Sequence, residues 1–102
     1  MTVTSAHRDL APDERLLVGG WTERDGGRTL DEVDRRILWL VSRRLTPLAV
    51  AEGGWRQLYL DPRDGRFWEL TFPHGSLHGG GPRRLECVVA LVAADRYGVE
   101  LG

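Results

Sequence analysis

The pattern of apolar and polar positions predicts one amphipathic helix in the first half of the chain. Apolar residues recur at spacings of three and four over residues 30–45, which is the period of a helix with one buried face. Thr29 followed by Glu32 has the form of a capping box, and Pro47 disfavours helical backbone in the residue before it. We therefore expect a helix that begins after Thr29 and ends near residue 45.

Two aromatic-rich stretches after this helix predict a β-hairpin. Residues 55–60 and 66–72 are of strand length and alternate in character with the period of two that strands have. The segment between them contains residue types that favour a tight turn, namely Asp61, Pro62 and Gly65. We expect the core face of the second strand to consist of Trp68, Leu70 and Phe72.

Two further strands are predicted, one before the helix and one after the hairpin. Residues 15–22 form an apolar stretch, although Gly19 and Gly20 would weaken its middle or form a bulge. Residues 85–89 are also apolar, and residues 89–97 either extend that strand or form a short closing helix that ends at Gly98. The predicted fold class is α+β: a small antiparallel sheet of about four strands packed against one main helix, with a short C-terminal helix as one of the two possible endings.

Length and composition indicate a single globular domain. The chain has 102 residues with 41% hydrophobic content, which is enough for one modest core without disulfides or metal. Residues 1–13 show little periodicity, so we expect a flexible N-terminal lead-in followed by one α+β domain over residues 14–102.

Charge and cysteine content limit the expected partners and compartment. The formal net charge is −1, so no sequence-wide field attracts nucleic acid or an anionic membrane, and we expect neither as a partner. The single cysteine, Cys87, cannot form a disulfide within its own domain, and no apolar run reaches the roughly 18 residues that span a bilayer. A cytoplasmic location is therefore expected.

The loop after the hairpin carries the residues with the most chemical potential. His74 and His78 have a spacing that would bind zinc on a helix, with Glu69 as a third ligand, but Pro73 and Gly75 argue against a helix there. The glycine run at residues 79–81 could surround a phosphate, yet it lacks the lysine of a P-loop. We expect no catalytic residue, metal ligand or cofactor; the alternative is a small metal- or nucleotide-binding enzyme that uses Glu69, His74, His78 and this glycine loop.

Several unusual strings resemble one protein family. They are Asp61-Pro62-Arg63-Asp64-Gly65-Arg66, Trp68-Glu69-Leu70-Thr71 and His78-Gly79-Gly80-Gly81-Pro82-Arg83. In this order they resemble the immunity protein 27 family of bacterial polymorphic toxin systems, and the similarity extends over about residues 20–97. Arg83 stands where the resemblance leads us to expect a second proline.

The resemblance implies an antidote protein rather than an enzyme. Such a protein is cytoplasmic, binds the cognate toxin domain encoded by a neighbouring gene, and protects the producing cell. We expect the outward residues of the hairpin and its following loop to form or border the toxin contact: Asp64, Arg66, Glu69, His74, His78 and Arg83. A second set is expected to support the fold: Trp55, Asp61, Pro62, Gly65, Trp68, Gly79, Gly80, Gly81 and Pro82.

Overall fold

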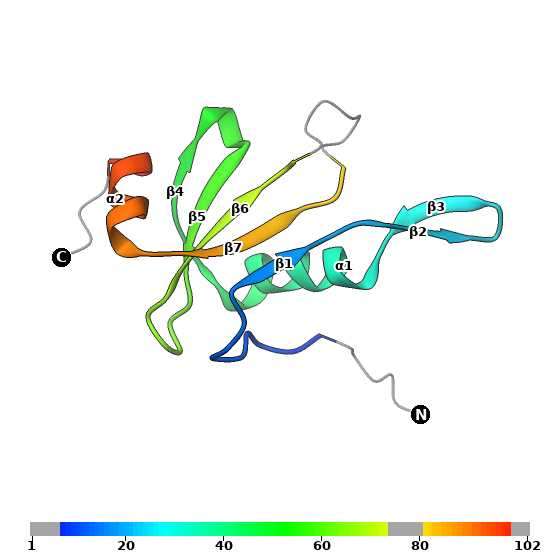
Figure 1. Cartoon of the computed structure of the whole chain (residues 1–102), viewed down its shortest axis with the longest axis horizontal. Coiled ribbons are helices and arrows are strands. Elements are labelled where there is room, and N and C mark those ends of the chain that lie inside the picture. The colour runs from blue at the N-terminus through cyan, green and yellow to red at the C-terminus, as the bar shows by residue number, and fades with distance from the viewer. Residues whose placement is uncertain (1–6, 74–80, 99–102) are drawn as a thin grey trace.

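The computed structural model describes residues 7–73 and 81–98, which form an antiparallel sheet with one long helical segment on one face (Figure 1). The sheet has five strands in the spatial order β1 (Leu16–Val18), β7 (Arg84–Val88), β6 (Phe67–Thr71), β5 (Arg56–Leu60) and β4 (Thr46–Ala51). The helical elements are α1 (Glu32–Trp39), the π-helical turn Leu40–Arg44, the 3₁₀ turn Glu52–Gly54 and α2 (Ala90–Tyr97). The predicted α+β class is confirmed; the main sheet of the described residues has five strands where about four were expected, and two further strands form a separate sheet.

The core lies between α1 and the face of the sheet that α1 covers. Alternation along β6 directs Trp68 and Leu70 toward this core, where both are buried, and Phe72 packs against its margin. The predicted core face is therefore confirmed for Trp68 and Leu70, whereas Phe72 follows the end of the strand and is only partly buried. The remaining buried members of the cluster come from the N-terminal segment, β1, α1, the π-helical turn and the other strands: Leu10, Leu17, Ile37, Leu40, Leu45, Tyr59 and Leu85.

The start of α1 differs from the prediction and its end agrees with it. Asp31, not Thr29, is the N-cap, and its side chain accepts a hydrogen bond from the backbone N–H of Asp34 at 2.9 Å. Thr29 lies in strand β3 (Gly27–Leu30), because pairing with β2 keeps its backbone extended. The helical segment ends at Leu45, whose backbone is extended just before Pro47.

The predicted single strand over residues 15–22 is wrong, because the chain divides at Gly19 and Gly20 into two strands of different sheets. Strand β1 joins the main sheet, whereas β2 (Trp21–Arg24) pairs only with β3 in an arm that projects from the body (Figure 1). A Cβ on Gly19 would lie 2.9 Å from both the Arg83 carbonyl oxygen and the Cβ of Asp34. Only glycine therefore fits at position 19, where the chain passes close to Arg83 and Asp34.

The described part of the expected N-terminal lead-in is anchored to the body. Leu10 is buried in the core, and the Arg36 guanidinium donates to the main-chain oxygens of Arg8 and Asp9 and to the Glu14 carboxylate. Long-range contacts thus hold residues 8–11, a segment that lacks periodicity of its own.

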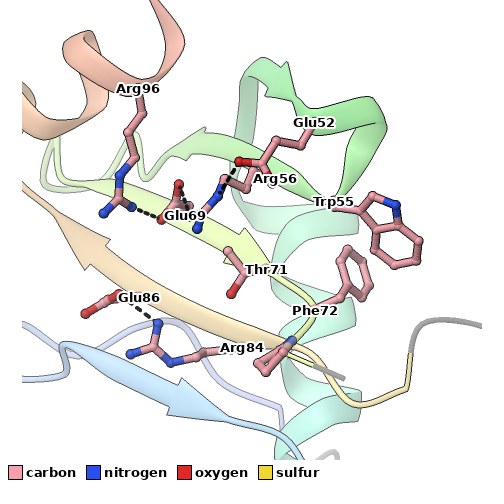
Figure 2. A pocket seen from close by; sticks show the side chains of 10 residues that line it. Glu52, Trp55, Arg56, Glu69, Thr71, Phe72, Arg84, Glu86 and Arg96 are labelled. Carbon is pink, nitrogen blue, oxygen red and sulfur yellow. Dashed lines mark hydrogen bonds and ion pairs between the residues drawn. The ribbon is translucent and has the colours of Figure 1, made fainter. Parts of the chain in front are cut away.

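The C-terminal alternative is decided in favour of a helix. Residues 90–97 form α2, and Gly98 ends it in the left-handed conformation at φ 63°. Helix α2 contacts β4 and extends side chains from its last turn to the middle of the sheet. It lies on the face of the sheet that α1 leaves open, and it covers only part of that face (Figure 2).

Candidate functional site

An open hollow of about 450 Å³ lies on the sheet face opposite α1. Strand pairing explains its composition, because side chains that alternate away from the core line up across β5, β6 and β7. Arg56 is paired with Thr71, Thr71 with Arg84, and Glu69 with Glu86. The full lining, most of which is labelled in Figure 2, is Glu52, Trp55, Arg56, Glu69, Thr71, Phe72, Pro73, Arg84, Glu86 and Arg96.

Glu69 forms the floor of this hollow and is only 2% exposed. One carboxylate oxygen accepts from Nη1 of Arg96, and the other accepts from the Tyr97 hydroxyl at 2.8 Å and lies 3.1 Å from Nη1 of Arg56. Two cations and one hydroxyl thus compensate a single buried carboxylate, as a buried charge requires. Because Arg96 and Tyr97 both belong to α2, Glu69 also tethers that helix to the sheet.

The groups around Glu69 keep their charged or donating forms. Burial, followed by the hydrogen bond to the Glu69 carboxylate, raises the pKa of Tyr97, so its hydroxyl stays protonated and donates. Burial opposes the charge on Arg56, but its hydrogen bonds to Glu69 and Glu52 outweigh this and raise its pKa. Tyr97 therefore acts as a hydrogen-bond donor to Glu69, and Arg56 acts as a cationic partner of Glu69.

Two apolar groups border the hollow. Trp55 is 47% exposed and meets Phe72 edge to face, with ring centroids 5.5 Å apart. On the other side Leu16 and Val18 of β1 are exposed, and their pairing with Glu86 and Arg84 places them on the same sheet face as the hollow. The uncovered face thus has a charged centre between two apolar margins.

A comparison with known protein families identifies the family of the chain. The family model described as immunity protein 27 matches residues 24–89, which is more than half of the chain. The chain belongs to the immunity protein 27 family. The match to immunity protein 27 includes α1 and strands β3 to β7, with Glu69, Arg56 and Arg84, and ends before α2 supplies Arg96 and Tyr97. No curated protein and no solved structure matches the chain.

Four of the six expected contact residues of this immunity protein 27 chain are described by the structure, and these four lie in different places. Glu69 lies in the hollow, whereas Asp64 and Arg66 lie at the β5–β6 turn, at the far end of the strands. Arg66 donates to the main-chain oxygens of Ala11 and Glu14 and thereby holds the N-terminal segment. Arg83 binds the buried Asp34 of α1, through its backbone N–H and its guanidinium. His74 and His78 lie outside the described residues.

The described members of the expected supporting set differ in their burial and contacts. Asp61 is buried and accepts hydrogen bonds from the backbone of Arg63 and Gly65, and Gly65 has a φ of 79°. Trp68 and Pro82 are fully buried, and Pro62 is exposed in the turn. Trp55 differs from these because it is half exposed at the margin of the hollow. Gly81 has a φ of 67°, and Gly79 and Gly80 lie outside the described residues.

Sequence reasoning missed Arg56, Arg84, Glu86, Arg96 and Tyr97. Alternation marks Arg56 and Glu69 as polar positions on their strands, but only the strand register places them beside each other. Arg96 and Tyr97 meet Glu69 across 27 and 28 residues of sequence, and no local pattern encodes such a distance.

The described residues were also compared with the requirements of a metal site and of a membrane-spanning helix. Among them, no group of three or more His, Cys, Asp or Glu side chains is placed to hold a metal ion. No helix within residues 7–73 and 81–98 has the length and apolar character needed to cross a bilayer.

Proposed function

We propose that this chain is the immunity protein of a bacterial polymorphic toxin system and that it binds and neutralises a cognate toxin domain in the cytoplasm. The toxin gene is expected to lie next to the gene for this chain. The observation that carries the proposal is the immunity protein 27 match over residues 24–89. Inhibition by binding requires no catalytic turnover, so we propose that the chain is not an enzyme.

The uncovered sheet face is the contact surface that the geometry supports best. Binding energy at protein interfaces concentrates in a few aromatic and arginine side chains near the centre of the contact. Trp55 supplies an exposed aromatic group beside three arginines, Arg56, Arg84 and Arg96. Each of these arginines already has a carboxylate partner within the chain, which holds its side chain in place before a toxin arrives.

The same contacts weaken the alternative of an enzyme that uses Glu69. Both carboxylate oxygens of Glu69 already accept hydrogen bonds from Arg96, Tyr97 or Arg56. A general base or a metal ligand needs a carboxylate oxygen that faces substrate or metal. The occupied oxygens of Glu69 therefore favour a structural tether over acid–base chemistry.

The test is a binding measurement between the full chain and the toxin domain encoded by the neighbouring gene. We expect a one-to-one complex in calorimetry and loss of toxin activity when the chain is added. Trp55→Ala should weaken binding by about tenfold or more, as is typical for an aromatic side chain that anchors a protein interface. Trp21→Ala is the matched control, because Trp21 has a similar exposure of 40% but lies on the projecting arm.

Each alternative result has a definite meaning. Absence of any complex with the toxin domain would overturn the antidote proposal. If Trp21→Ala weakens toxin binding and Trp55→Ala does not, the toxin contacts the arm formed by β2 and β3 rather than the sheet face.

A further inference from the structure

The hollow offers more hydrogen-bond donors than its buried carboxylate can accept. Both oxygens of Glu69 already have donors, whereas each arginine keeps N–H groups that have no acceptor among the described residues. Among the contacts of the described residues, Arg96 and Arg84 each donate from Nη1 alone, to Glu69 and Glu86. Arg56 donates from Nε to Glu52 and lies close to Glu69 through Nη1. The Nη2 groups of Arg56, Arg84 and Arg96 thus have no acceptor in this part of the chain.

These three guanidinium groups remain accessible from solvent. The side chains of Arg56, Arg84 and Arg96 are 34%, 33% and 44% exposed. Figure 2 shows Arg56 and Arg96 approaching Glu69 from different elements. Arg84 lies on the neighbouring strand β7, and Thr71 lies between Arg56 and Arg84. A group that enters the hollow therefore meets N–H donors contributed by β5, β7 and α2.

The charge of the hollow limits which anion it suits. Its lining contains three arginines and three glutamates, so its formal charge is zero. Long-range attraction of a polyanion such as nucleic acid needs a net positive patch. A neutral hollow with unused guanidinium donors instead suits one anionic group at short range, and carboxylates match the planar donor geometry of arginine.

We propose that the hollow receives a carboxylate side chain of the toxin domain, an aspartate or a glutamate, which accepts hydrogen bonds from Arg84 and Arg96. The inference rests on the proposed function and adds the chemistry of the partner to it. The Trp55–Phe72 pair at the margin contacts the aliphatic stem or an apolar neighbour of that acidic residue. Glu69 remains bound to α2 beneath it and holds the Arg96 donor in position.

The first test uses the isolated full chain and a small probe, so that it does not depend on the toxin. N-acetyl-glutamate N-methylamide is titrated into ¹⁵N-labelled chain, with the glutamine analogue as the uncharged control. We expect the glutamate probe to shift the Nε–H resonances of Arg84 and Arg96 and the indole N–H of Trp55. Equal shifts with the glutamine probe, or none with either, would overturn the carboxylate inference.

A polyanion is tested in the same way with a single-stranded DNA oligonucleotide. We expect no saturable shift of the three resonances at physiological salt. Saturable binding of the oligonucleotide that Arg84→Gln abolishes, with no response to the glutamate probe, would assign the hollow to phosphate and overturn the inference.

The second test separates this inference from the antidote proposal. Arg84→Gln should weaken toxin binding by about tenfold, whereas Arg43→Gln, an exposed arginine on the π-helical turn, should leave it unchanged. Arg84 is chosen because it is not a partner of Glu69. Wild-type affinity in Arg84→Gln would overturn the carboxylate inference while the antidote proposal stands. Failure of the unmodified chain to bind the toxin would overturn the antidote proposal, and the small-probe result would still report on the hollow.

Discussion

Replacing Glu69 with glutamine tests whether this buried carboxylate joins α2 to the sheet. Glutamine has nearly the same shape, so the core should not acquire a cavity. The change removes the negative charge that Arg56, Arg96 and Tyr97 share, and it places an amide N–H₂ donor where a carboxylate oxygen now accepts. At least one of the three donors then loses its acceptor.

The magnitude follows from the burial of the groups involved. Removing one member of a fully buried ion pair costs about 3–5 kcal/mol of unfolding free energy. Here the two arginines are 34% and 44% exposed and can turn toward water, so we expect a smaller loss of about 2 kcal/mol. For a domain of this length that loss corresponds to a decrease in Tm of about 8–15 °C.

The assay combines urea denaturation with hydrogen exchange. Backbone amides of α2 should lose protection more than those of β5 and β6, because Arg96 and Tyr97 supply the side-chain hydrogen bonds between α2 and Glu69. Glu86→Gln is the control: Glu86 is a more exposed carboxylate on β7 with one arginine partner, so its loss should cost about 0.5 kcal/mol or less. Equal stability of the two variants, or unchanged protection of α2, would refute the assigned role of Glu69.

Three further predictions concern contacts outside the hollow. Leu10→Ala should lower the unfolding free energy by about 2–4 kcal/mol because Leu10 is buried in the core, whereas exposed Leu91→Ala should cost about 0.5 kcal/mol or less; urea denaturation of both variants decides whether residues 8–11 belong to the folded unit. The hydrogen bond from Arg36 lowers the pKa of Glu14 from 4.5 to about 2. Stability from this carboxylate is therefore fully present above about pH 5 and is lost as the pH falls toward 2, so the stability difference between wild type and Glu14→Gln should shrink over that interval in pH-dependent denaturation. Gly19→Ala should destabilise by about 1–3 kcal/mol because the new methyl group meets the Arg83 carbonyl oxygen, whereas Gly20→Ala meets only the end of the Asp31 side chain; similar Tm values for the two would contradict this packing argument.

The parts of the fold that were predicted correctly depend on residues close together in the sequence. The Asp61 turn, the alternation along β6 and the helical stripe that ends before Pro47 each follow from a few neighbouring side chains. The errors occur where a distant contact outweighs a local preference. Thr29 has the local features of an N-cap but is held in β3 by pairing with β2, and the N-cap lies two residues later at Asp31.

The candidate site shows the same division. The sequence identifies Glu69 as a candidate third metal ligand and as an expected contact residue within a string that carries the family resemblance. Its burial and its partners could not be foreseen, because they require the register of β5 to β7 and the return of α2 across the sheet. The sequence-based site consequently included Arg66 and Arg83, whose guanidinium groups hold the N-terminal segment and α1.

The fold class, the hairpin with its turn, the amphipathic helix and the resemblance to the immunity protein 27 family all follow from the sequence alone. These properties depend on local periodicity, turn chemistry and short strings, all of which are present before the chain folds. The tertiary structure alone decided that residues 15–22 divide between two sheets, that Leu10 enters the core, and that Glu69 meets Arg56, Arg96 and Tyr97 in one hollow. These outcomes depend on which distant segments pack together, because a buried charge or an apolar side chain is stabilised by its neighbours in space.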